Sequence, residues 1–219
     1  MKEPWIKGGP FLEVSFLYEI EINIIKTIEI IMNKLKLSIY PIEFMDSNLD
    51  ELVDSFNKGY IFDSEDPNSV HIHSLKLRLY INIPEKRKAT LSIDNVSSNM
   101  LMINFCFFGS QSDAYEWDQI GINTEDIIEF SKFFVNLFNL YKFTIGSIGI
   151  ENYIISLFGD KMFPNECYSK EKIYQNLDIS KINKFLYIMI NNNFIDLNTI
   201  QFKTMEKVKE SALLKINDL

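Results

Sequence analysis

The pattern of hydrophobic and polar residues predicts β-strands through much of the first 110 residues. In three runs, apolar residues recur at nearly every second position, which places them on one face of a strand. These runs are 11–18, 70–83 (with one break, at His73 and Ser74) and 89–96. The run 101–108 is instead apolar at nearly every position, as expected of a central strand that is covered on both faces. Short turns at 84–87 and 97–99 separate the last three strands, so we expect an antiparallel meander.

Apolar residues three and four positions apart predict amphipathic helices elsewhere in the chain. The expected helices span 21–37, 49–57 and 124–141. Asn48 can cap the second helix and Gly59 can end it, whereas Asn123 or Thr124 can cap the third. The apolar stripe of the third helix is expected to pack on the sheet.

The chain changes character after about residue 159. Before that point, a strand is expected over 143–150, where Gly146 and Gly149 would allow a bend or the close approach of another backbone. Beyond it, helical spacing is found in 169–175, 179–191 and 203–216. We therefore predict an α+β fold in which helices pack on an antiparallel sheet. The predicted core domain spans 1–159, and a helical C-terminal appendage, packed on the core, spans 160–219.

The charge of the chain is negative. Its 219 residues include 30 Asp and Glu against 22 Lys and Arg, a formal net charge of -8. A nucleic-acid-binding protein normally presents a basic face, so the charge argues against nucleic acid and favours a basic protein partner. Solubility alone would also account for an acidic chain. No apolar run approaches the roughly 20 residues that cross a bilayer, and the first residues lack the apolar region of a signal peptide. We expect a cytoplasmic protein with no membrane partner.

Residue types that carry catalysis or metal binding are few and scattered. His71 and His73 are the two histidines, and neither Cys106 nor Cys167 has a metal-ligand spacing with them. The glycines on either side of Ser147 do not have the spacing of a nucleophile elbow, and no glycine-rich phosphate loop occurs. We expect no catalytic residue, no metal and no other cofactor. Cys106 lies in an apolar run, which predicts a buried free thiol.

The most distinctive segment is an acidic loop with aromatic residues, 109–121. No Lys or Arg occurs from 111 to 130. Aromatic residues dominate the binding energy of many interfaces, and Trp offers a ring face to Arg or Lys. The predicted partner-binding residues are Asp113, Tyr115, Glu116, Trp117 and Asp118. In the alternative, Trp117 folds onto the core and anchors the loop. A second acidic stretch, 43–66, has eight acidic residues and one basic residue.

Part of the chain resembles a known class of proteins. The segments that carry the resemblance are FCFFGS at 105–110, EWDQ at 116–119, GI at 121–122 and GSIGIE at 146–151, with an aromatic helix before the last. They are similar to stretches in the immunity proteins that accompany bacterial polymorphic toxins. The resemblance implies a small, acidic, non-catalytic, cytosolic α+β protein that binds a toxin.

Three hypotheses of different classes follow. The leading one is an immunity-like protein that neutralises a cationic partner, such as a toxin domain, by stoichiometric binding. The second is an enzyme without a short motif that acts through carboxylates near Trp117. The third is a regulatory or structural subunit that dimerises through its helical tail.

Overall fold

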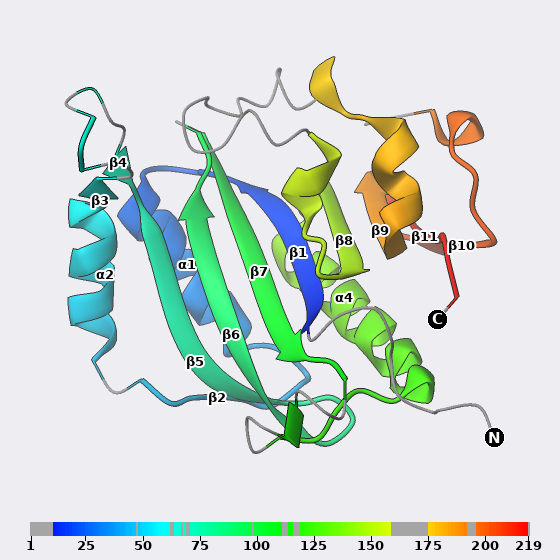
Figure 1. Ribbon diagram of the computed structural model, residues 1–219, viewed down its shortest axis with the longest axis horizontal. Helices are drawn as coiled ribbons and strands as arrows, with labels where there is room; N and C mark the ends of the chain where they lie inside the picture. The colour runs from blue at the N-terminus through cyan, green and yellow to red at the C-terminus, as the bar shows by residue number, and fades with distance from the viewer. Residues whose placement is uncertain are drawn as a thin grey trace.

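One large antiparallel sheet organises the computed structural model, which describes residues 11–46, 48–61, 64–66, 68, 71–97, 99–110, 114–115, 119–158, 175–191 and 196–218. Its strands are β1 (Phe11–Glu19), β2 (Ile42–Phe44), β5 (Ser74–Asn82), β6 (Lys86–Asn95), β7 (Met100–Phe108), β8 (Ile145–Ile150), β9 (Phe185–Asn191), β10 (Thr204–Val208) and β11 (Ser211–Lys215). They lie in the order β10-β11-β9-β8-β1-β7-β6-β5-β2 (Figure 1). β3 (Tyr60–Ile61) and β4 (His71–Ile72) form a separate pair. The predicted α+β class with an antiparallel sheet is confirmed, as is the meander of β5, β6 and β7.

Three α-helices accompany the sheet in the described ranges. They are α1 (Ile24–Leu35), α2 (Leu49–Lys58) and α4 (Ile127–Tyr141), the last preceded by the 3-10 turn η1 (Thr124–Asp126). Further 3-10 helices are η2 (Ile154–Leu157), η3 (Ile179–Lys184) and η4 (Leu197–Thr199). The predicted ends of α2 are confirmed. The side chain of Asn48 accepts a hydrogen bond from the backbone N–H of Glu51, and Gly59 ends the helix with a φ of 65°, a conformation that suits glycine.

The main core lies between the sheet and the pair α1 and α4, which Figure 1 shows behind the same face. Alternation along β5 and β6 sends their apolar residues to this face. Aromatic rings of α4 meet those of β7 edge to face: Phe105 and Phe133 have centroids 5.4 Å apart, and Phe107 and Phe130 5.0 Å. Such pairs add to the stability that area burial provides. The prediction that the helix over 124–141 packs on the sheet is therefore confirmed.

A second apolar cluster covers part of the opposite face, mainly over the later strands, and it also includes Leu17 of β1 and Met100 and Met102 of β7. Residues of η2 and η3 pack there against β8, β9 and β11, with Leu157, Ile188 and Leu214 among the fully buried residues. On the other face of β8, Gly146 allows the close packing of α4 and β1, because a Cβ at this position would lie 2.8 Å from the backbone oxygen of Ser15 and 2.9 Å from the ring of Phe134. The expectation that a glycine of this strand permits the approach of another backbone is confirmed.

The prediction of helices over 179–191 and 203–216 is wrong beyond η3. Residues 185–191 form β9, and 203–216 contain the hairpin of β10 and β11, which turns at Lys209 with a φ of 54°. β9 is apolar at nearly every position, so helical spacing and strand burial on both faces fit it equally well. The segment forms a strand because it pairs with β8, and such tertiary contacts override helix propensity. The described part of the predicted appendage is thus mainly strand. The division of the chain at 159 stays a prediction, and 169–174 lie outside the described residues.

Candidate functional site

A row of polar side chains crosses five adjacent strands on the sheet face opposite α1 and α4. Cross-strand pairing places Lys76 beside Ser92, Ser92 beside Asn104, Asn104 beside Ser15, and Ser15 beside Ser147. Residues in register on antiparallel strands point to the same face, so the five side chains form a continuous line. β5 and β6 send their apolar residues to the helices, so their part of this face is polar, whereas Ser15 and Ser147 at the other end of the row are fully buried.

Polar residues extend this row toward both ends of the strands. On one side Ser74 pairs with Asp94, and on the other Cys106 pairs with Glu13. The name polar face is used here for Glu13, Ser15, Ser74, Lys76, Ser92, Asp94, Asn104, Cys106 and Ser147. No α-helix in the described ranges packs over its β5–β7 part.

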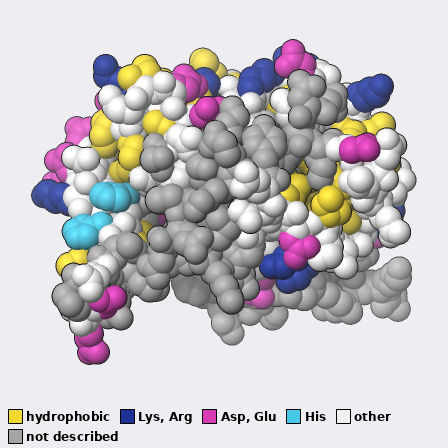
Figure 2. Space-filling view, turned by 90° about the horizontal axis from the view of Figure 1, so that it is seen from above, with side chains coloured by type: hydrophobic (Ala, Val, Ile, Leu, Met, Phe, Trp, Pro, Cys, Tyr) yellow, Lys and Arg dark blue, Asp and Glu magenta, His cyan; other side chains and the backbone are white. Residues whose placement is uncertain are grey.

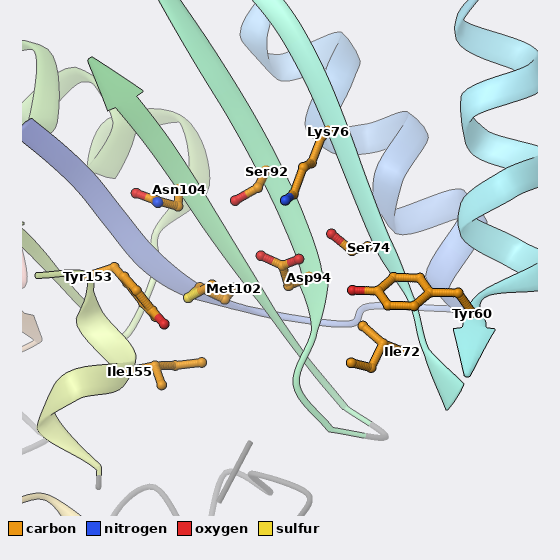
Figure 3. Close-up of a pocket in the computed structure, with 10 residues that line it drawn as sticks. All are labelled: Tyr60, Ile72, Ser74, Lys76, Ser92, Asp94, Met102, Asn104, Tyr153 and Ile155. Carbon is orange, nitrogen blue, oxygen red and sulfur yellow. The ribbon is translucent and has the colours of Figure 1, made fainter. Parts of the chain in front are cut away.

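A hollow of about 220 Å³ opens on this face at the Ser74–Asp94 end. Polar residues of β5, β6 and β7 line it, and Met102, Ile72 and Ile155 add apolar surface. In Figure 3 the carboxylate of Asp94 lies at the centre of the hollow, with the ring of Tyr60 on one side and that of Tyr153 on the other. The hollow therefore combines aromatic sides with a polar floor, a combination typical of binding sites.

Two buried acceptor atoms of the polar face have no hydrogen-bond partner in the described residues: Glu13 Oε2 and Asn104 Oδ1. Asn104 is only 7% exposed. A buried polar atom without a partner costs about 1–3 kcal/mol, so native proteins rarely retain several on one surface. The neighbouring serines show the usual arrangement. The Oγ of Ser15 lies 3.1 Å from that of Ser147 and accepts a 2.7 Å hydrogen bond from the backbone N–H of Ile154 in η2.

Burial controls the ionisation of the two carboxylates on this face. It raises the pKa of Asp94, although hydrogen bonds from the hydroxyls of Ser74 and Ser92 and the positive charge of Lys76 act to lower that pKa. Lys76 and Asp94 nevertheless form no ion pair within the described part of the structure. Burial also raises the pKa of Glu13 to about 7, opposed by a hydrogen bond from Asn104 and assisted by repulsion from Glu151. Both carboxylates would gain from a positive charge placed beside them.

The thiol of Cys106 on this face is poorly suited to act as a nucleophile. Cys106 is a free thiol, as predicted, although it is half-buried rather than buried. Burial, with a contribution from Glu13, raises the pKa of the Cys106 thiol to about 12. The thiolate is the nucleophilic form, and almost none is present at neutral pH.

The two histidines lie at the surface beside β3 and β4, and Figure 2 shows them next to each other with acidic side chains nearby. Nδ1 of His73 lies 2.8 Å from the backbone oxygen of Phe56. That oxygen can only accept a hydrogen bond, so Nδ1 is the donor and the ring has a structural role beside α2. Within the described residues, no three or more His, Cys, Asp or Glu side chains are grouped so that they could hold a metal ion.

The structure places one of the five predicted contact residues. Tyr115 is 78% exposed and therefore available to a partner. Asp113, Glu116, Trp117 and Asp118 lie outside the described residues, so their contact role stays a prediction. The segment follows the end of β7, whereas the hollow lies beside the first half of that strand. The structure thus separates the two candidate regions along the strands.

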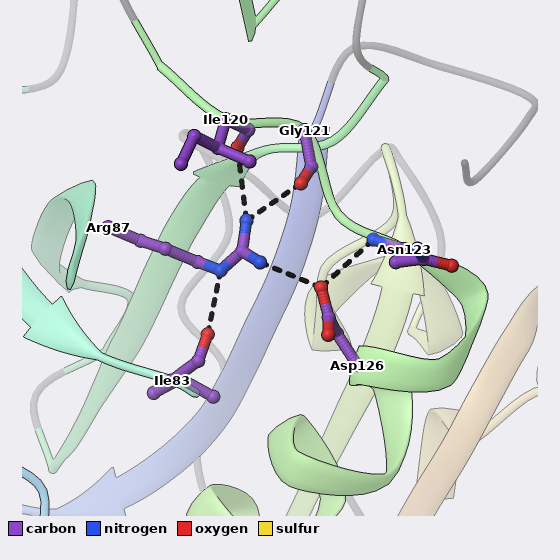
Figure 4. Close-up of polar contacts among 6 residues, drawn as sticks. All are labelled: Ile83, Arg87, Ile120, Gly121, Asn123 and Asp126. Atoms are coloured by element: carbon purple, nitrogen blue, oxygen red, sulfur yellow. Dashed lines mark hydrogen bonds and ion pairs between the residues drawn. The ribbon is translucent and has the colours of Figure 1, made fainter. Parts of the chain in front are cut away.

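Arg87 anchors the end of this predicted loop (Figure 4). Its guanidinium donates to the backbone oxygens of Ile83, Ile120 and Gly121 at 2.7, 3.0 and 2.8 Å. It also forms a 2.7 Å ion pair with Asp126 at the start of the helix. Only 5% of Arg87 is exposed. Burial lowers the pKa of the guanidinium, although the negative charge of Asp126 acts to raise it. The signal that identifies Arg87 in the sequence is its register, because it shares a strand face with apolar residues of β6.

The second acidic stretch, 43–66, divides into paired and exposed residues. Asp46 binds Arg78 at 2.7 Å and Glu43 binds Lys86 at 2.6 Å. The acidic residues of α2, which include Asp50 and Asp54, are exposed.

Comparisons with protein-family models, curated proteins and solved structures found no match. The helices within the described ranges include none that is long and apolar enough to span a membrane.

Proposed function

We propose that this chain acts by binding a basic protein partner, and that the polar face forms part of the contact surface. The observation that carries the proposal is the pair of unpartnered buried acceptors at Glu13 and Asn104. A partner that donates hydrogen bonds to these atoms would remove their desolvation cost when the complex forms.

The chemistry of the face favours Lys and Arg as the donors. Both side chains donate hydrogen bonds and accept none, and both carry the charge that Glu13 and Asp94 require. The net charge of -8 would also speed the approach of a basic protein. The exposed Tyr60 and Tyr115 offer aromatic contacts at the two ends of this surface.

The biological role that we propose is immunity-like: stoichiometric binding that neutralises a cationic partner such as a toxin domain. The resemblance of 105–151 to immunity proteins supports this role. The high pKa of the Cys106 thiol also favours binding over catalysis through this cysteine.

Affinity capture with the tagged protein at low salt, followed by reconstitution with the purified captured protein, tests the proposal. We expect a basic partner, a 1:1 complex by light scattering, and an affinity that falls between about 50 mM and about 300 mM salt because exposed charges are screened. The double variant Glu13→Gln, Asp94→Asn should weaken the complex. The matched control Asp50→Asn, Asp54→Asn removes the same charge from exposed positions on α2 and should have a smaller effect. A partner that is not basic, or equal effects of the two double variants, would contradict the proposal.

A further inference from the structure

We propose that the hollow beside Asp94 binds a single arginine side chain of the partner. This inference rests on the proposed function and makes it more specific, because it names the group that the partner inserts. The hollow is the part of the polar face where a buried carboxylate, hydroxyl groups and aromatic rings occur together.

The acceptors of the hollow match a guanidinium group. The Asp94 carboxylate lies beside Ser74 of β5 and Ser92 of β6, whereas the side chain of Asn104 points away from it (Figure 3). The hydroxyls of Ser74 and Ser92 hydrogen-bond to the Asp94 carboxylate, whose remaining lone pairs are left for the donors of a partner. A guanidinium presents five N–H donors in a planar fork and can therefore serve several acceptors at once, whereas an ammonium is a compact point charge.

The sides of the hollow suit the rest of an arginine side chain. Tyr60 is 55% exposed, so one ring face is accessible for stacking with a guanidinium. Met102 and Ile155 provide apolar surface for the methylene stem. The fixed strands β5, β6 and β7 hold the acceptors in place, so little rearrangement would be needed for binding.

Lys76 lies within the same hollow and is the competing cation. It is exposed and forms no ion pair with Asp94 in the described residues. Its charge is carried on a flexible, strongly hydrated side chain that can remain in solvent. An arginine that donates to Asp94 would replace only a weak electrostatic contact, and removal of Lys76 should strengthen binding.

An NMR titration of the intact protein with N-acetyl-arginine methylamide tests the inference. The matched control probe is N-acetyl-citrulline methylamide, which has a similar shape without the charge. We expect saturable shifts of the amide signals of Ser74, Asp94 and Asn104 with the arginine probe, and binding of the citrulline probe that is weaker by about 10-fold or more. Asp94→Asn should lower the affinity for the arginine probe by a similar factor, and Lys76→Ala should raise that affinity. Asp54→Asn on α2 should leave it unchanged.

Equal binding of the two probes, shifts that do not saturate, or an Asp94→Asn variant with unchanged affinity would overturn the inference. These outcomes are distinct from failure of the proposed function. If a basic partner binds in a salt-dependent manner while the arginine probe does not bind the hollow, the pocket assignment alone is wrong. If the probe binds as expected while the captured partner is not basic, the proposed function is wrong and the arginine site remains.

Discussion

The earlier and later strands of the sheet differ in the residues that they carry on the face opposite α1 and α4. Over β5 and β6 one face packs on helices and the other carries polar side chains, whereas β9 and β11 are apolar on both faces; β7, β1 and β8 carry both kinds of residue on the second face. A single row shows the change: it begins at Lys76, passes through Asn104, and ends at Ile188 of β9, which is fully buried. The comparison shows that burial of the second face depends on η2 and η3, which cover the later strands and reach as far as β1 and the first residues of β7 but not β5 and β6. Where that cover ends, buried acceptors remain without partners, and there we place the binding surface.

The largest effect is expected from a polar residue in the apolar half. Ile188→Asn removes a buried apolar side chain and buries an amide, which should lower the free energy of unfolding by about 5 kcal/mol. Urea denaturation followed by circular dichroism measures the loss. A loss below about 1 kcal/mol would show that this position tolerates a polar residue, and the contrast between the halves would then be wrong.

The next largest effect concerns the anchor at the other end of the polar half. Arg87→Ala leaves Asp126 half-buried without its cation and removes the donor of three backbone oxygens. We expect unfolding to become easier by about 3 kcal/mol. Lys132→Ala is the control, because Lys132 forms an exposed ion pair with Glu129 and should cost less than about 0.5 kcal/mol. Similar losses for the two variants, measured by thermal or urea unfolding, would contradict the structural role of Arg87.

A smaller effect should appear as a pH dependence of stability. The pKa of Glu13 is about 7 in the folded protein, above its ordinary value of 4.5, so the folded state holds the proton more tightly. The stability from this group is complete below about pH 4.5 and is lost as the pH rises through 7. Glu13→Gln should therefore be more stable than the parent at pH 8 by about 2 kcal/mol and nearly equal to it at pH 4. A difference that does not change between these two pH values would show that Glu13 titrates normally.

The smallest effect is expected outside both halves of the sheet. Because Tyr115 is exposed, Tyr115→Ala should change the free energy of unfolding by less than about 0.5 kcal/mol. Its affinity for the partner should fall if the acidic aromatic loop belongs to the contact surface. An intact variant with unchanged affinity would remove Tyr115 from that surface.

Much of the first 150 residues could be predicted from the sequence, because most strands and helices there have one apolar face that matches their period, and short turns bound the apolar run of β7. The three-strand meander, the helix over 124–141 and the ends of α2 are examples. β9 could not be assigned in this way, because a segment that is apolar on both faces has no distinguishing period.

The candidate site was harder to predict because its residues are far apart in the sequence and meet only through strand register. Glu13, Asp94 and Asn104 come from β1, β6 and β7. Asn104 within an otherwise apolar run was the one local signal. The loop that the sequence favoured, by contrast, is placed only at Ala114 and Tyr115 among its central residues.

The most direct test of the binding surface is the affinity of Asn104→Leu for the captured basic partner, measured together with its free energy of unfolding. The change replaces a buried amide, whose Oδ1 has no partner and whose Nδ2 donates one long hydrogen bond of 3.5 Å to Glu13, with an apolar side chain of similar size. We predict a variant whose stability is within about 1 kcal/mol of the parent, because relief of the unpartnered Oδ1 offsets the lost bond to Glu13, and an affinity reduced by about 10-fold or more. A stable variant that binds the partner as well as the parent does would show that the polar face is not the binding surface.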